Sequence, residues 1–106
     1  MIIAKFYKNK DNILLGFEVS GHAGFADSGE DVVCASVSSA VMLTCNTATE
    51  AFGVNAKVDV AEDRILFKIN SDKNNTGDKL VLGLFTHLYF LSEEYPDNII
   101  VKEVLK

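Results

Sequence analysis

The sequence predicts an α+β fold of order ββαββαβ, in which two helices pack with a mostly antiparallel sheet. Five stretches alternate apolar and polar residues as strands do, and two longer stretches repeat apolar residues at helical spacing. Two pairs of strands are joined by turns short enough for hairpins. With 106 residues, of which 48% are hydrophobic, the chain is long enough for one core, so we expect a single domain over residues 1–106.

The two predicted hairpins come before and after the first predicted helix. Their strands are expected at Ile2 to Lys8 and Ile13 to Ser20, and at Lys57 to Ala61 and Arg64 to Asn70. Asn9 to Asn12 form the first turn, and Glu62 and Asp63 form the second. A last strand is expected from Asn98 to Leu105, after Pro96 has ended the second helix.

The first helix is predicted from about Asp31 to Phe52, with Gly53 as the residue that ends it. Its apolar stripe is Cys34, Val37, Val41, Cys45, Ala48 and Phe52. The second helix is predicted from about Gly77 to Tyr95 and is apolar on more than one face. A helix of that composition is buried on most sides, so it is either central to the domain or part of a subunit interface.

The charge of the chain narrows the possible partners. A net charge of −5 argues against non-specific binding to nucleic acid or to an anionic membrane surface, and it is compatible with a basic partner. We expect no stretch long and apolar enough to span a bilayer, and no signal peptide, so the cytoplasm is the expected location. No metal site, cofactor motif or phosphate-binding loop is expected.

Residues 21–40 bring a possible base and a possible nucleophile close together. Gly29, Glu30 and Asp31 predict a helix start with Asp31 as the N-cap, which places Cys34 in the first helical turn. There the unpaired N–H groups and the helix dipole favour a thiolate. His22 lies in the loop expected from Gly21 to Glu30, where an imidazole can reach that thiolate.

Each of these residues also has a simpler interpretation. Cys34 could be a small buried hydrophobe, and His22 could bond only to backbone or water. Asp27, Glu30 and Asp31 could serve turns and helix capping, or they could form an acidic rim that attracts a basic peptide. The residues alone do not decide between these interpretations.

The sequence Gly-His-Ala at 21–23, followed by Gly-Glu-Asp-Val-Val-Cys-Ala-Ser-Val-Ser at 29–38, resembles the signature of the bacterial ribosomal-processing cysteine protease family. The similarity in length and element order extends over essentially the whole chain. It implies a cysteine endopeptidase that trims the N-terminal extension of a large-subunit ribosomal protein (L27 type), and it implies a homodimer.

The resemblance also implies roles for individual residues. Cys34 corresponds to the nucleophile and His22 to the general acid and base. Asp31, Ser38 and Gly21 correspond to supporting positions, although Ser38 could instead be a small packing residue. The resemblance implies a basic peptide substrate, which Asp27 and Glu30 would help to attract, and no cofactor. The alternative is a non-catalytic ribosome-assembly or peptide-binding module.

Overall fold

The computed structural model describes the backbone of residues 1–21, 28–72 and 75–106, and the side chains of residues 28–31 lie outside the description. The predicted order ββαββαβ is confirmed, with a π-helical turn, η1, added at the end of the first helix. The elements are β1 (Ile2–Lys8), β2 (Leu14–Ser20), α1 (Ser28–Asn46), η1 (Thr47–Ala51), β3 (Asn55–Ala61), β4 (Arg64–Ser71), α2 (Gly77–Glu94) and β5 (Ile99–Leu105).

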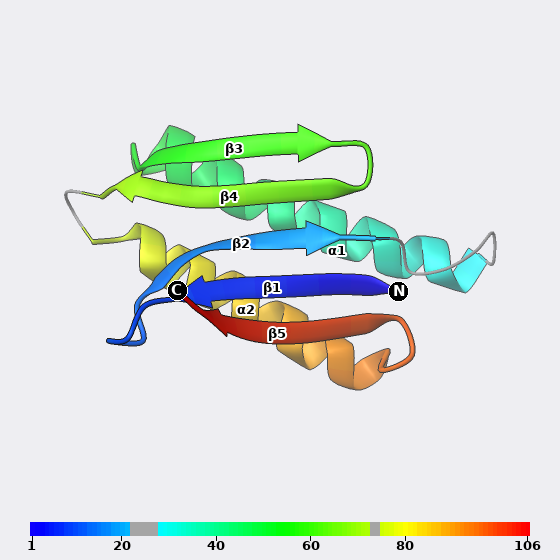
Figure 1. Cartoon of the computed structure of the whole chain (residues 1–106). Coiled ribbons are helices and arrows are strands. Elements are labelled where there is room, and N and C mark those ends of the chain that lie inside the picture. Colours follow the sequence, from blue (N-terminus) through cyan, green and yellow to red (C-terminus); the bar gives the residue numbers. More distant parts are fainter. Residues whose placement is uncertain (22–27, 73–74) are drawn as a thin grey trace.

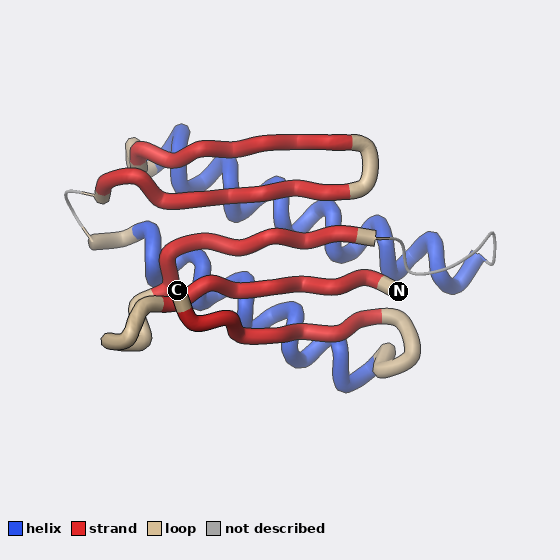
Figure 2. Tube along the Cα trace, in the orientation of Figure 1, coloured by secondary structure: helices blue, strands red, loops and turns tan. Residues whose placement is uncertain are grey.

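The strands form one mixed sheet in the order β3-β4-β2-β1-β5. Both predicted hairpins are antiparallel, and β2 also pairs antiparallel with β4. The pairing of β1 with β5 is parallel, with Ile2 opposite Ile99 and Lys8 opposite Leu105. Figures 1 and 2 show that α1 and α2 both lie behind the sheet, so the opposite face of the sheet carries no helix.

The core lies between the sheet and the two helices. Phe6, Phe17 and Phe67 come from adjacent strands and are fully buried, and the rings of Phe17 and Phe67 stack at 5.2 Å. The rings of Phe85 of α2 and Phe6 form a T-shaped pair with their centroids 5.1 Å apart. Aromatic pairs of this kind add to the stabilisation from apolar burial, so they fix α2 against the centre of the sheet.

The first helix differs from its prediction at both ends. It begins at Ser28, three residues before the predicted N-cap Asp31, and it continues into the π-helical turn η1. Phe52 is 48% exposed rather than part of the buried stripe, whereas Val33 is buried. Because a π turn contains an extra residue, it rotates the residues after it away from the helical period. Gly53 ends the helix as predicted, with φ of +64°.

The second helix has its predicted bounds but not its predicted burial. Only Gly77, Val81, Leu84 and Leu88 are buried. Leu82, Tyr89 and Phe90 are 51%, 48% and 60% exposed, so α2 is not a central helix. Its outer face leaves apolar side chains uncovered in the described chain.

The segment Val32–Ala51 is long and apolar enough to cross a membrane by length and composition alone, with a mean hydropathy of 1.4 over an 18-residue window. The expectation that no stretch meets this criterion was therefore wrong. The core helix of a soluble protein passes the same test, and the buried side chains Val33, Val37 and Val41 of this helix belong to the core cluster.

Candidate active site

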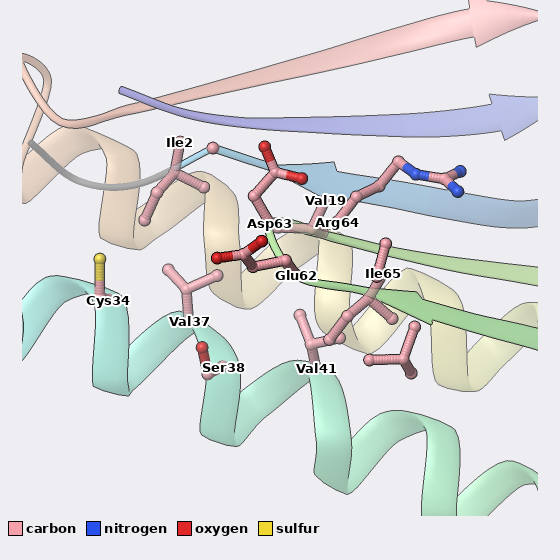
Figure 3. A pocket seen from close by; sticks show the side chains of 13 residues that line it. Ile2, Val19, Cys34, Val37, Ser38, Val41, Glu62, Asp63, Arg64 and Ile65 are labelled. Carbon is pink, nitrogen blue, oxygen red and sulfur yellow. The ribbon is translucent and has the colours of Figure 1, made fainter.

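A cavity of about 250 Å³ lies between α1 and one end of the sheet. Its walls come from the start of β1, the middle of α1, the end of β2 and the β3–β4 turn with its flanking residues (Figure 3). The lining residues are Ile2, Val19, Gly21, Cys34, Val37, Ser38, Val41, Val60, Ala61, Glu62, Asp63, Arg64 and Ile65. Three of the predicted site residues, Cys34, Ser38 and Gly21, therefore share one cavity.

Cys34 lines this cavity from α1. Its side chain is half-buried and packs against the core, and Figure 3 shows its sulfur pointing from α1 towards the sheet. Because α1 begins at Ser28, Cys34 is in the second helical turn and not in the first. The attraction of a helix N-terminus for negative charge fades within the first turn, so the predicted dipole contribution at Cys34 is smaller than expected.

Ser38 lies one helical turn beyond Cys34 and lines the same cavity. Its side chain is exposed, so it is not buried in helix packing. Val37 and Val41, on the same helix, form an apolar floor with Ile65 of β4. The cavity is thus lined by the thiol of Cys34, the hydroxyl of Ser38 and apolar side chains.

Gly21 contributes through its backbone. Its φ is +86°, a conformation that favours glycine, and a Cβ atom built on it would lie 2.3 Å from the carbonyl oxygen of Met1. Its N–H donates a 3.0 Å hydrogen bond to the carbonyl oxygen of Asp63. Gly21 therefore joins the end of β2 to the β3–β4 turn at the wall of the cavity.

Two acidic residues at the cavity were not predicted as site residues. Glu62 and Asp63 form the two-residue turn between β3 and β4, and in Figure 3 the carboxylate of Glu62 points to the side where Cys34 lies. Neither forms an ion pair with a described residue. Their position in a tight turn was visible in the sequence, but their proximity to Cys34 depends on how the sheet packs on α1.

Arg64 follows this turn but does not neutralise it. Its guanidinium contacts Glu18 at 3.2 Å and Asp59 at 3.3 Å. The hydrogen bond to Glu18 is the main cause of the raised pKa of Arg64. In Figure 3 its side chain points away from the cavity. Among the described residues, the turn therefore presents negative charge at the cavity without an ion-pair partner.

The remaining predicted site residues are only partly described. His22 and Asp27, with Gly24 of the same loop, lie outside the described residues. Glu30 and Asp31 lie in α1 rather than in the loop or at an N-cap, and their side chains lie outside the description. Within the described residues no group of three or more metal-ligating side chains is present.

Cys45, the second cysteine, has a different environment. It is 2% exposed, and burial raises the pKa of its thiol to about 11. A thiol with such a pKa is neutral at physiological pH and is a poor nucleophile. The two cysteines are thus distinguished by exposure: Cys34 opens onto a cavity and Cys45 belongs to the core.

The sequence of this chain resembles those of known cysteine proteases. The family model described as cysteine protease Prp matches residues 1–100. The ribosomal processing cysteine protease Prp of Bacillus subtilis (strain 168) is 30% identical over 105 residues, which covers 93% of this chain and 94% of that protein.

Solved structures show the same fold. A crystal structure of an essential ribosomal processing protease Prp from S. aureus, with a covalently linked product peptide, has a TM-score of 0.89 at 19% identity and covers 98% of this chain and 100% of that one. The crystal structure of SMU.848 from Streptococcus mutans has a TM-score of 0.78 at 27% identity and covers 100% of this chain and 96% of that one.

The fold, the cavity with its cysteine and these relatives define a cysteine-type peptidase. Within that class, the chain belongs to the cysteine protease Prp family.

Proposed function

We propose that this peptidase removes the N-terminal extension of a large-subunit ribosomal protein of the L27 type during ribosome assembly. The observation that carries the proposal is the position of Cys34, whose thiol opens onto a cavity that Ser38 also lines. The B. subtilis relative is named a ribosomal processing protease, which supports the same substrate class. A substrate from the assembling ribosome would place the reaction in the cytoplasm.

In the proposed mechanism Cys34 is the nucleophile and His22 is the general acid and base. The Cys34 thiolate attacks the scissile carbonyl carbon, and the carbonyl oxygen becomes a tetrahedral oxyanion. As the C–N bond breaks, protonated His22 gives its proton to the leaving amine, and a thioester to Cys34 remains. His22 then accepts a proton from water, the hydroxide attacks the thioester, and the acid product and Cys34 are released.

The direct test is incubation with the precursor ribosomal protein and identification of the new N-terminus by mass spectrometry. Cys34→Ala and His22→Ala should each lower cleavage by at least about a thousandfold, because base and nucleophile act as a unit. The double variant should lose little more than either single variant. Cys45→Ala is the matched control and should retain activity if it stays folded. Full cleavage by the Cys34→Ala protein would instead favour the non-catalytic binding module.

We also propose that the peptidase works as a homodimer. The motive is the exposed apolar surface of α2, where Leu82, Tyr89 and Phe90 are about half or more exposed. Phe90→Glu should convert the dimer to a monomer in sedimentation velocity experiments. Ile13→Glu, at an apolar residue 45% exposed in the β1–β2 turn, should leave the dimer intact. A monomeric wild-type protein at high concentration would contradict the proposal.

A further inference from the structure

The face of the sheet that carries no helix has its own chemistry. Because side chains alternate along a strand, the buried residues Ala4 and Phe6 face the helices, and Lys5 and Tyr7 face the opposite side. The strand pairing extends this pattern across the sheet. We call this surface the open face, and Figure 1 looks directly onto it.

The open face is basic, although the chain as a whole is acidic. Five of the nine lysines lie on it: Lys5, Lys57, Lys68, Lys102 and Lys106. Among the residues that the structure describes on these strands, the acids of the open face are Glu18 and Asp59, and both contact Arg64. Glu18 is also the register partner of Lys5. The five lysines and Arg64 still outnumber these two acids, so the net charge of −5 does not describe this surface.

Two pairs of these lysines face each other across neighbouring strands. Lys5 of β1 is the register partner of Lys102 of β5, and Lys57 of β3 is the partner of Lys68 of β4. Like charges placed directly opposite each other destabilise a sheet. Residues that break such a rule in a folded protein tend to mark functional sites. An anion that bridges each pair would remove the repulsion.

A hollow of about 540 Å³ lies between these lysine pairs, over Gly16. The other residues that line it are Tyr7, Leu15, Glu18, Leu66, Phe67, Lys68 and Lys106, so one carboxylate lies there beside two lysines. No side chain can fill the hollow from position 16, because a Cβ atom there would lie 2.1 Å from the carbonyl oxygen of Phe67. The ammonium group of Lys106 lies 4.7 Å from the centre of the Tyr7 ring at the same place.

We propose that the open face binds single-stranded nucleic acid, with phosphates on the lysines and a base in the hollow over Gly16. Non-specific sites for single strands combine a positively charged track with surfaces on which bases lie. Here the lysines supply the positive charge, and the largely apolar hollow beside Tyr7 supplies the surface for a base. A membrane surface fits less well, because peripheral membrane binding inserts protruding apolar groups, whereas Tyr7 is half-buried beside a recess.

The proposal is tested by fluorescence anisotropy with a labelled oligouridylate of about twelve nucleotides, a length within the usual site size for one small domain, and with oligothymidylate as the DNA counterpart. Wild-type protein should bind at low salt and lose affinity as salt rises. Lys57→Glu/Lys68→Glu should weaken binding at least about tenfold. Lys10→Glu/Lys79→Glu, which changes the net charge equally but lies off the open face, should weaken it less than about threefold.

A neutral variant keeps the test valid if the charge-reversed protein does not fold. Lys57→Gln/Lys68→Gln should reduce the slope of log affinity against log salt by about 1.4, since each lost phosphate contact removes about 0.7 for a single strand. It should melt no lower than wild type, because a like-charge pair is removed.

The proposal would be overturned by no binding of either oligonucleotide at low salt, by equal losses in the control variant, or by an unchanged salt slope in the neutral variant. Vesicles of phosphatidylglycerol and polyglutamate serve as competing anions. Binding to either that is as tight and as sensitive to Lys57 and Lys68 would show a generic anion surface instead. Cleavage of the ribosomal precursor is not part of this measurement, so the two proposals fail independently.

Discussion

The backbone N–H of Gly21 donates a 3.0 Å hydrogen bond to the carbonyl oxygen of Asp63 and so joins the end of β2 to the β3–β4 turn. These two residues are far apart in the chain, yet both line the cavity that contains Cys34. A substitution at Gly21 that shifts its backbone would therefore shift both the β3–β4 turn of Glu62 and Asp63 and the wall of the cavity. Replacement by proline, which has no N–H, would remove this bond.

Gly21→Ala should destabilise the protein by about 1–3 kcal/mol, because an alanine at φ +86° is strained and its Cβ would meet the Met1 carbonyl. The free energy of unfolding in urea measures this loss. Gly83→Ala is the control, since nothing lies within 4 Å of a Cβ atom there. In the middle of α2 this change should be neutral or should stabilise by up to about 1 kcal/mol. Equal stability of the two variants would show that the backbone at Gly21 tolerates a side chain.

Ser38→Ala should weaken cleavage without abolishing it. Ser38 lies one turn from Cys34 on the same cavity, so we expect it to position His22 or contact the substrate. A loss of about ten- to a hundredfold in kcat/KM, with unchanged stability, would fit this supporting role. Ser39→Ala is the matched control, because Ser39 lines the groove between the helices instead. If Ser38→Ala lost as much activity as Cys34→Ala, Ser38 would be essential for cleavage and not merely supporting.

The buried thiol of Cys45 predicts a loss of stability at alkaline pH. Burial raises its pKa from the ordinary value of 9.0 to about 11, so the folded state holds a proton that the unfolded state releases in this range. The stability that the protonated Cys45 thiol contributes is fully present below about pH 9, and it is lost as the pH rises towards 11. Between these pH values, this one group lowers the free energy of unfolding by at most about 1.4 kcal/mol per pH unit. In urea unfolding at several pH values, Cys45→Ala should lack this slope, whereas Cys34→Ala should retain it.

Glu62 and Asp63 should attract a basic substrate, together with Asp27 and Glu30. Glu62→Gln/Asp63→Asn should lower kcat/KM for the basic precursor about three- to tenfold at low salt, and the difference should shrink as salt screens the charges. Cleavage of a neutral peptide should change little. The control is Glu93→Gln/Glu94→Gln, which removes the same amount of negative charge at the end of α2, outside the cavity. Equal effects of the two variants would contradict local attraction.

Much of the fold was predictable because it depends on local periodicity. The alternation of Phe17 and Val19 predicts a strand, and the spacing of Val37, Val41 and Cys45 predicts one buried helical face. The position of Phe52 was not predictable, since the π turn before it changes the period. The helix start at Ser28 was also missed, because the capping residues near Asp31 suggested a later start.

The candidate site was predictable only where its residues are close in sequence. Cys34 and Ser38 are one helical turn apart, so their common cavity follows from the helix. Glu62 and Asp63 reach the same cavity through the pairing of β4 with β2, for which the sequence has no local signal. The positive charge of the open face was likewise not predictable from the sequence, because a net charge sums over all surfaces of the folded protein.

The parallel pairing of β1 with β5 has a consequence for how the molecule is made. The two strands pair with Ile2 opposite Ile99, so β1 is synthesised well before the strand with which it pairs. Until β5 pairs, the edge of β1 that faces away from β2 is unpaired, and such an edge can pair with other chains. Contacts over so long a separation also slow folding. This edge of β1 is therefore covered only after β5 has been synthesised, and a chain that lacks residues 99–105 would expose it.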